Sequence, residues 1–132
     1  MVLVDSSVWI DYFNGVHSPE TNALDALLGQ ELVQIGDLIL TEVLQGFRTD
    51  AGYRQARELL EPLRLRRLGG REVALAAADN YRFLLSRVVT VRKTIDVVIA
   101  SFCLLHGIEL LHADRDFDAI EKHLRLRVYR PA

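Results

Sequence analysis

A short apolar run that breaks into closely spaced acids constrains this chain more than any other feature. Residues 108–111 form the run Ile-Glu-Leu-Leu, and Asp114, Asp116 and Asp118 follow it at every second position. If the run is a buried strand, these acids lie at its carboxyl end, which is the edge of an open α/β sheet where ligands bind. Carboxylates this close repel one another, so a bound divalent metal ion is the simplest compensation.

The N-terminus repeats this arrangement. Residues 2–4 are a continuous apolar run that ends at Asp5, as expected for a strand buried on both faces of a parallel sheet. Ser6 or Ser7 is expected to cap a helix that extends to Phe13. Two strand ends therefore direct carboxylates toward one place.

Two further acids lie in helices that are otherwise apolar. Glu42 falls in a helix expected after the loop Gly36-Asp37, and a helix glutamate is more often simply solvated. Asp96 lies in a predicted helix that Thr94 caps and Gly107 ends. An acid near a helix N-terminus gains from the helix dipole, but a helix this apolar has no need of a charge unless a cation or hydrogen bonds hold it. We therefore interpret Asp96 as a functional residue.

The order of the predicted elements indicates an α/β fold. Strands are expected at residues 2–4, 32–35, 63–68, 108–111 and 126–129, with helices between them. Strands that alternate with helices favour a central parallel sheet with helices on both faces, joined by right-handed crossovers. We predict one domain over residues 1–132.

Acids and bases are segregated along the chain. Residues 1–47 contain seven acids and no lysine or arginine, so all 16 bases lie after residue 47, and 14 of them are arginine. The planar guanidinium suits phosphate, so a polyanion is one expected ligand. The alternative is that these arginines only form the solvated face of amphipathic helices.

Several classes of site and location are disfavoured. No apolar run approaches the roughly 18 residues that cross a bilayer, and Met1 leads directly into a strand, so we expect a cytoplasmic protein. A single cysteine, Cys103, excludes an internal disulfide. The four histidines (His17, His106, His112, His123) lack the close pairing of zinc ligands. Hard oxygen ligands instead favour Mg²⁺ or Mn²⁺.

Four motifs, in order along the whole chain, resemble those of the PIN domain, and more narrowly those of the VapC toxins of prokaryotic type II toxin-antitoxin systems. They are Asp5-Ser6-Ser7, residues 42–46 (Glu-Val-Leu-Gln-Gly), residues 94–100 (Thr-Ile-Asp-Val-Val-Ile-Ala) and residues 110–117 (Leu-Leu-His-Ala-Asp-Arg-Asp-Phe). The resemblance implies a PIN-like three-layer fold with a parallel sheet of order 3-2-1-4-5. It also implies an endoribonuclease that depends on Mg²⁺ or Mn²⁺, a homodimer, and inhibition by a VapB-type antitoxin.

Motif matching assigns roles to individual residues. The resemblance implies that Asp5, Glu42, Asp96 and Asp114 form a catalytic quartet, and that Asp116 is an auxiliary ligand, so the predicted metal ligands are Asp5, Asp96, Asp114 and Asp116. The predicted substrate contacts are Ser6, Arg92, Arg115 and His112. One residue departs from the family pattern, because His112 stands where the family often has threonine or serine.

Two other functions remain open from the sequence. A phosphotransfer or haloacid-type enzyme would use a strand-end aspartate as nucleophile, but such enzymes need a second acid two residues later, where this chain has Ser7. A PIN-like domain that binds RNA or a partner without cleaving is the other alternative. An intact set of four acids favours the nuclease.

Overall fold

The computed structural model describes residues 1–131. Within this range the strands are β1 (Val2–Val4), β2 (Val33–Gly36), β3 (Arg64–Arg66) and β4 (Glu109–Leu111). The helices are α1 (Ser6–Phe13), α2 (Pro19–Gly29), α3 (Asp37–Gln45), α4 (Asp50–Leu60), α5 (Arg71–Ser86), α6 (Thr94–His106) and α7 (Asp116–Leu124).

The strands form one parallel sheet of order β3-β2-β1-β4. At the carboxyl edge, Val4 of β1 pairs with Leu111 of β4, and the N–H of Asp5 donates to the carbonyl oxygen of Leu111 at 2.9 Å. When two parallel strands end in register, the residues that follow them lie at the same edge of the sheet. Asp5 and the β4–α7 loop therefore begin side by side.

The predicted fifth strand is reduced to a single bridge, so the described sheet has four strands instead of five. Val128 pairs with Leu110 in the parallel sense, through hydrogen bonds of 2.9 Å from Leu110 N–H to Arg127 O and from Tyr129 N–H to Leu110 O. The segment thus lies beside β4, in the fifth position of the expected order. Arg125, just before it, ends α7 in the left-handed region (φ 59°), and pairing is confined to one residue beyond this bend.

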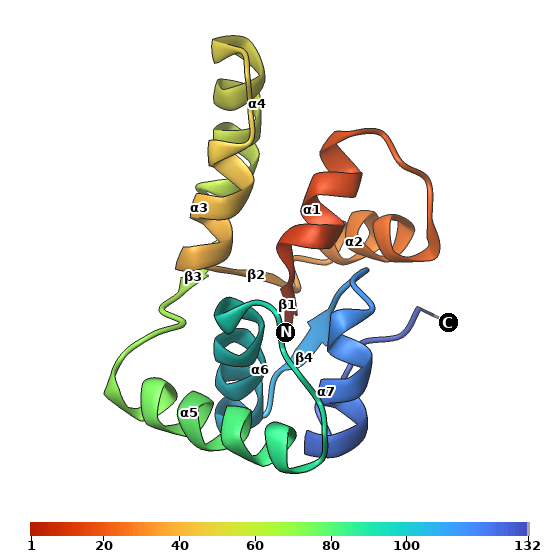
Figure 1. Ribbon diagram of the computed structural model, residues 1–132. Helices are drawn as coiled ribbons and strands as arrows, with labels where there is room; N and C mark the ends of the chain where they lie inside the picture. The colour runs from red at the N-terminus through yellow and green to blue at the C-terminus, as the bar shows by residue number, and fades with distance from the viewer. Residues whose placement is uncertain (132) are drawn as a thin grey trace.

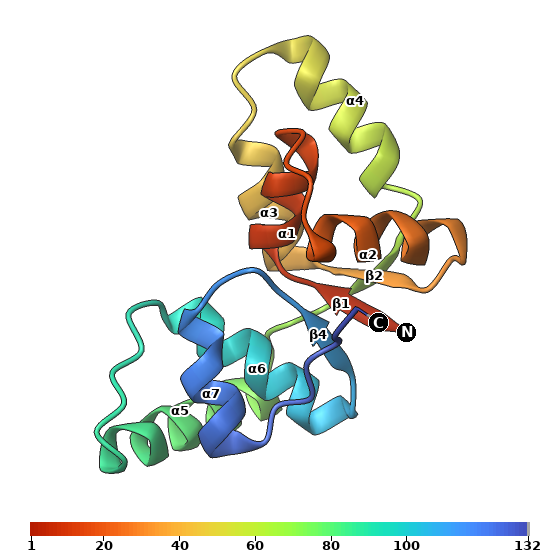
Figure 2. The ribbon, with the colours of Figure 1, turned by 90° about the vertical axis from the view of Figure 1, so that its right-hand side faces the viewer.

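Helices cover both faces of the sheet, as predicted. Figure 1 shows α1, α2, α3 and α4 on one side of the strands and α5, α6 and α7 on the other. The packing agrees with this division, because α1 contacts α2 and α3, α3 contacts α4, and the three later helices contact one another. In Figure 2, α6 lies between α5 and the sheet. The result is a three-layer α/β fold.

Two predicted helix caps are wrong, and one helix end is confirmed. The carboxylate of Asp5, not a serine hydroxyl, caps α1. Lys93 occupies the N-cap position of α6, so Thr94 is the first helical residue and offers no side-chain cap. Gly107 ends α6 in the left-handed conformation (φ 63°), which glycine adopts without the steric cost of a Cβ atom.

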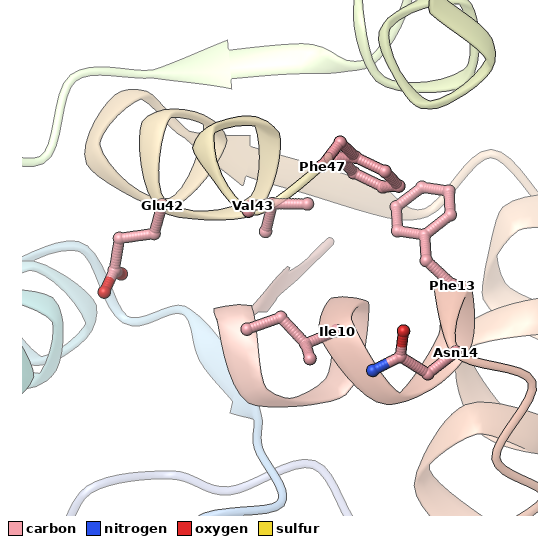
Figure 3. Close-up of a pocket in the computed structure, with 7 residues that line it drawn as sticks. Ile10, Phe13, Asn14, Glu42, Val43 and Phe47 are labelled. Carbon is pink, nitrogen blue, oxygen red and sulfur yellow. The ribbon is translucent and has the colours of Figure 1, made fainter. Parts of the chain in front are cut away.

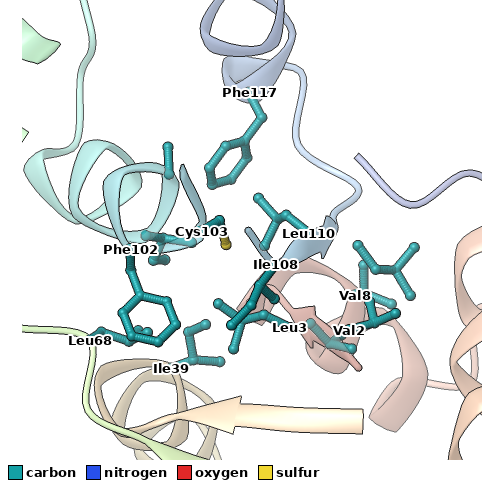
Figure 4. Close-up of a cluster of buried hydrophobic side chains, with 14 of the residues drawn as sticks. Val2, Leu3, Val8, Ile39, Leu68, Phe102, Cys103, Ile108, Leu110 and Phe117 are labelled. Atoms are coloured by element: carbon teal, nitrogen blue, oxygen red, sulfur yellow. The ribbon is translucent and has the colours of Figure 1, made fainter. Parts of the chain in front are cut away.

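The core joins the two helical layers through the sheet. Trp9, Phe102 and Phe117 are fully buried, and Figure 4 shows Phe102 and Phe117 on opposite sides of Cys103, near Leu110 and Leu3. Trp9 therefore belongs to the core. Within residues 1–131, no helix combines the length and the apolar character that a membrane crossing requires.

The last residue of β2, Gly36, has no room for a side chain, so a larger residue there should destabilise the fold. A Cβ atom added at Gly36 would lie 2.6 Å from Cγ of Leu68, and Leu68 is fully buried. Because overpacking forces neighbouring side chains off their rotamers, Gly36→Ala should lower the free energy of unfolding by about 1–3 kcal/mol. Chemical denaturation at equilibrium measures this change.

Gly29→Ala is the matched control, because a Cβ atom there meets nothing within 4 Å and alanine favours a helix. Its free energy of unfolding should stay the same or rise. Combining Gly36→Ala with Leu68→Ala should cost less than the sum of the two single changes. Additive costs would show that Leu68 is not the obstacle.

Candidate functional site

Four elements bring acids to the carboxyl edge of the sheet. Asp5 follows β1, Asp114 follows β4, Asp96 lies in the first turn of α6, and Glu42 lies on α3, which begins directly after β2. Asp5 and Asp96 are buried, and Glu42 and Asp114 are half-buried. Burial of several carboxylates at one edge is costly unless cations or hydrogen-bond donors accompany them.

Asp5 is held by the start of α1. Its Oδ2 atom accepts from the backbone N–H of Ser7 at 3.1 Å and from the Ser7 hydroxyl at 2.6 Å. These donors satisfy one oxygen of a carboxylate that is only 3% exposed. Asp5 thus acts as a helix cap and as a member of the acidic edge at once.

Asp96, Asp114 and Asp116 form a compact group. Each offers an oxygen, and these oxygens lie within 4.8 Å of one another. The N–H of Asp116 donates to Oδ1 of Asp114 at 2.9 Å, which fixes the turn that leads into α7. Three of the four predicted metal ligands are therefore brought together, whereas Asp5 lies outside this group but acts on it through its charge.

Burial and neighbouring negative charge raise the pKa of two of these acids, Asp96 and Glu42. Burial, and then the charge of Asp5, raise the pKa of Asp96 to about 7, with smaller contributions from Asp114 and Asp116 and an opposing one from Lys93. Burial and the charge of Asp5 also raise the pKa of Glu42, opposed by the Ser6 hydroxyl and Lys93. Perturbed carboxylates grouped at a sheet edge are typical of a functional site.

Two buried oxygens lack a protein partner. Among residues 1–131, neither Oδ2 of Asp96 nor Oε1 of Glu42 accepts a hydrogen bond. Since an unpaired buried oxygen is costly, these atoms are suited to a ligand that supplies positive charge. The donor set consists of carboxylates alone, so it fits a hard divalent cation such as Mg²⁺ or Mn²⁺.

Two cationic side chains of the α5–α6 connection reach the acids. Arg92 donates to Oδ1 of Asp116 at 3.0 Å, and the Lys93 Nζ atom lies 3.8 Å from Oδ2 of Asp114. Both cationic side chains are well exposed, at 78% and 59%. Solvent screens such pairs, so they stabilise the fold little, and Arg92 and Lys93 remain available to a phosphate.

The other predicted substrate contacts occupy different environments. Ser6 is half-buried beside Glu42, and Arg115 is exposed next to Asp114. The ring of His112 packs against Phe117, at 4.9 Å between ring centres, and its Nδ1 atom accepts from the N–H of Asp114 at 3.2 Å. His112 is therefore turned toward the protein, and substrate contact by these residues stays a prediction.

Two residues that contact the acids, Lys93 and Ser7, are absent from the site residues predicted from the sequence. Lys93 precedes Asp96 by three residues, and its place at a helix N-terminus was a detectable signal. Ser7 donates to Asp5, and its Oγ atom also accepts from the N–H of Ala113 at 3.0 Å. The second contact joins residues 106 positions apart, so no local pattern could have predicted it.

Comparison with known proteins places the chain in a family. Residues 2–123 match the family model of the PIN domain. VapC ribonuclease Mb1587 of Mycobacterium bovis and Ribonuclease VapC11 of Mycobacterium tuberculosis are each 30% identical to this chain over 129 residues. Each alignment covers 96% of both proteins.

Solved structures share the fold at lower sequence identity. VapBC2 from Rickettsia felis, bound to a DNA fragment of its promoter, has a TM-score of 0.75 at 13% identity, covering 98% of each chain. A toxin-antitoxin complex from Klebsiella pneumoniae has a TM-score of 0.73 at 21% identity, covering 100% of this chain and 98% of that one. The family model and the relatives agree along nearly the whole sequence, and the chain belongs to the PIN-domain family, within its VapC group.

Proposed function

We propose that this chain is a divalent-metal-dependent endoribonuclease, the toxin of a VapBC toxin-antitoxin module. The observation that carries the proposal is the convergence of Asp96, Asp114 and Asp116 within 4.8 Å, beside buried Asp5 and half-buried Glu42. Relatives that span the chain are named VapC ribonucleases, which supports RNA as the substrate. A domain that binds RNA or a partner without cleaving it is the alternative, and the Asp96 variant described below distinguishes the two.

Asp5, Asp96, Asp114 and Asp116 would hold the metal ion, the last three through oxygens that lie within 4.8 Å of one another and Asp5 from beside that group, with Glu42 at the margin of the site. A bound Mg²⁺ or Mn²⁺ ion lowers the pKa of a water and offsets charge on a phosphodiester. Hydrogen bonds from Ser7 to Asp5 and from the Asp116 N–H to Asp114 keep these carboxylates oriented before any ligand arrives. The unpaired oxygens of Asp96 and Glu42 are able to accept a proton from a nearby water.

Arg92 and Lys93 would bind the phosphates that flank the cut. Both lie at the acidic edge and are exposed, and Arg115 lies on the neighbouring loop. A single-stranded RNA that follows these cations would bind less tightly as salt rises, by about 0.7 in the logarithmic slope for each phosphate neutralised. The substrate would thus be held on the side of the α5–α6 connection.

The proposed inhibitor is a VapB-type antitoxin that covers the apolar groove between α1 and α3. This groove has a volume of about 170 Å³, and its lining includes Ile10, Phe13, Val43 and Phe47, with Glu42 at its margin. Figure 3 shows Glu42 pointing away from Phe47 and Phe13, whose rings pack edge to face with their centres 5.4 Å apart. A segment with apolar side chains followed by a lysine or arginine would fill the groove and place a cation near the acids.

A second copy of the chain is the other proposed partner. The groove between α5 and α6 has a volume of about 440 Å³ and is lined largely by apolar groups, including Ala74, Ala78, Tyr81 and Val98. Small side chains allow helices of two subunits to approach closely, and two-fold homodimers are the commonest oligomers. Sedimentation of the purified chain as a monomer at micromolar concentration would contradict this.

The Asp96→Asn variant tests the acidic site. It should lower the rate of cleavage by at least about 100-fold, because mutation of residues that only orient the ligands of a metal already lowers metal affinity or activity by about 10–100-fold. Folding raises the Asp96 pKa from 3.8 to about 7, so its ionisation lowers the stability of the metal-free protein. The protonated carboxyl of Asp96 therefore contributes stability that is fully present below about pH 4 and is lost as the pH rises through about 7.

Metal-free wild type should therefore melt at a lower temperature than Asp96→Asn at pH 8, and the difference should shrink toward pH 5. Thermal melting in EDTA across this range measures it, and Mn²⁺ should raise the wild-type melting temperature at pH 8. Asp79→Asn, on the exposed surface of α5, is the matched control and should change neither property. A variant that melts lower than wild type at pH 8 would mean that Asp96 is structural.

A further prediction concerns which atom attacks the phosphodiester. Metal-free ribonucleases use the 2′-hydroxyl of RNA with histidines as acid and base, but His112 packs against Phe117 with its Nε2 atom buried. We expect water to attack instead, which leaves 3′-hydroxyl and 5′-phosphate ends. Mass spectrometry of the products identifies the ends.

A 2′-methoxy group at the scissile nucleotide alone should then leave measurable cleavage, reduced by lost contacts, and EDTA should stop cleavage completely. Products with 2′,3′-cyclic phosphate, or cleavage by pure protein in excess EDTA, would refute the role of the acids.

The antitoxin proposal predicts that Ile10→Glu weakens binding of the antitoxin encoded beside this chain. Ile10 lines the α1–α3 groove and is 46% exposed. The Ile10→Glu variant should therefore fold normally, but it places a charge in the apolar surface that the antitoxin would cover. We expect at least a tenfold loss of affinity, equal to about 1.4 kcal/mol, with ribonuclease activity retained. Leu105→Glu, at a comparably exposed position on α6 (42%), is the control, and equal binding of the antitoxin by both variants would exclude the groove as its binding site.

A further inference from the structure

The Ser7 hydroxyl joins the two strand ends that carry the acids. It donates to Oδ2 of Asp5 at 2.6 Å and accepts from the backbone N–H of Ala113 at 3.0 Å. A serine hydroxyl has one proton and can accept at its oxygen, so these bonds use it in both directions. Ser7 therefore links the end of β1 to the β4–α7 loop.

On the β1 side, Ser7 fixes the orientation of the Asp5 carboxylate. Its hydroxyl and its backbone N–H both donate to Oδ2. A carboxylate held by two donors on one oxygen cannot rotate freely about its last bond, so the direction of the other oxygen, Oδ1, is set as well.

On the β4 side, the Ser7 hydroxyl connects the β4–α7 loop to α1 through a hydrogen bond. Ala113 precedes Asp114, whose N–H donates to Nδ1 of His112 at 3.2 Å, and the Asp116 N–H donates to Asp114 at 2.9 Å. The hydrogen bonds to His112 and to Asp114 both lie within the loop and its junction with α7. They fix the conformation of the loop, but they do not fix how far the loop lies from β1. Only the Ser7 bond, among the side-chain hydrogen bonds of this loop, reaches across to the N-terminal segment.

We propose that Ser7 is a positioning residue, which holds Asp5 against the loop that carries Asp114 and so keeps Asp5 beside the group of Asp96, Asp114 and Asp116, where a divalent cation would bind. The inference rests on the proposed function, because it assumes that these acids bind a metal ion. Negative charge on Asp5, Asp96 and Asp114 drives their segments apart, whereas hard cations bind tightly only when their oxygen ligands are already placed. A hydrogen bond across the two segments opposes that separation without adding charge to the site.

The experiment compares Ser7→Ala with wild type in two measurements that do not need turnover. Mn²⁺ affinity, measured by calorimetry, should fall about 10-fold, in the range seen when residues that orient metal ligands are removed. In the metal-free protein, the Ala113 amide should exchange its hydrogen about 10-fold faster, because its acceptor is gone. Ser86→Ala is the matched control, since the exposed Ser86 hydroxyl bonds only to the nearby carbonyl of Phe83.

Action through Asp5 is tested by a double-mutant cycle. In an Asp5→Asn background, Ser7→Ala should cause little further loss of Mn²⁺ affinity, because the group that it orients no longer ligates well. At saturating metal, Ser7→Ala should lower kcat several-fold and leave the KM for RNA within about twofold of wild type. Ser7→Cys, similar in size with a weaker donor, should show intermediate Mn²⁺ affinity and serves if the alanine variant folds poorly.

Wild-type Mn²⁺ affinity in both Ser7 variants would overturn the inference, and so would an equal loss of affinity with and without Asp5. Failure of the proposed function is a separate outcome, because wild type itself would then bind no Mn²⁺ in the same titration and would not cleave RNA.

Discussion

Repulsion among carboxylates at one edge of the sheet is the constraint that the rest of this structure accommodates. Asp5 and Asp96 are almost completely buried, and burial with the neighbouring charges raises the pKa of Asp96 to about 7. A fold selected only for stability would place apolar side chains here. The surrounding elements instead supply the start of α1 to Asp5, the N-terminus of α6 to Asp96 and a backbone N–H to Asp114.

The compensation is incomplete, which is why the edge is suited to a cation. Asp96 and Glu42 each keep one buried oxygen without a protein partner, and the nearby cations Arg92 and Lys93 are too exposed to neutralise the acidic group effectively. Sites that bind metal commonly sacrifice stability in the metal-free state and recover it on binding. The same exposure leaves both cations free for a polyanionic ligand.

The two helical layers contribute different parts of the edge. Asp5 and Glu42 come from the layer of α1 to α4, whose first 47 residues contain no lysine or arginine, and Asp96, Lys93 and Arg92 come from the second layer. The sheet and the buried core around Leu3, Leu110 and Phe102 fix the position of one helical layer relative to the other (Figure 4). The Ser7–Ala113 hydrogen bond adds a direct link where the acids meet.

The sequence by itself determined the fold class and most of the candidate site. Apolar runs that end at Asp5 and before Asp114, and an acid inside the apolar helix of Asp96, are local patterns whose meaning does not depend on distant contacts. Only the tertiary structure decided that residues 126–129 pair at one residue, that Asp5 caps α1, and that Ser7 bonds to Ala113. The physical reason is that the bridge and the Ser7–Ala113 hydrogen bond depend on distances between segments that the chain brings together only when it folds. Which residue caps α1 depends on the backbone conformation at the end of β1, whereas periodicity is present in the chain before it folds.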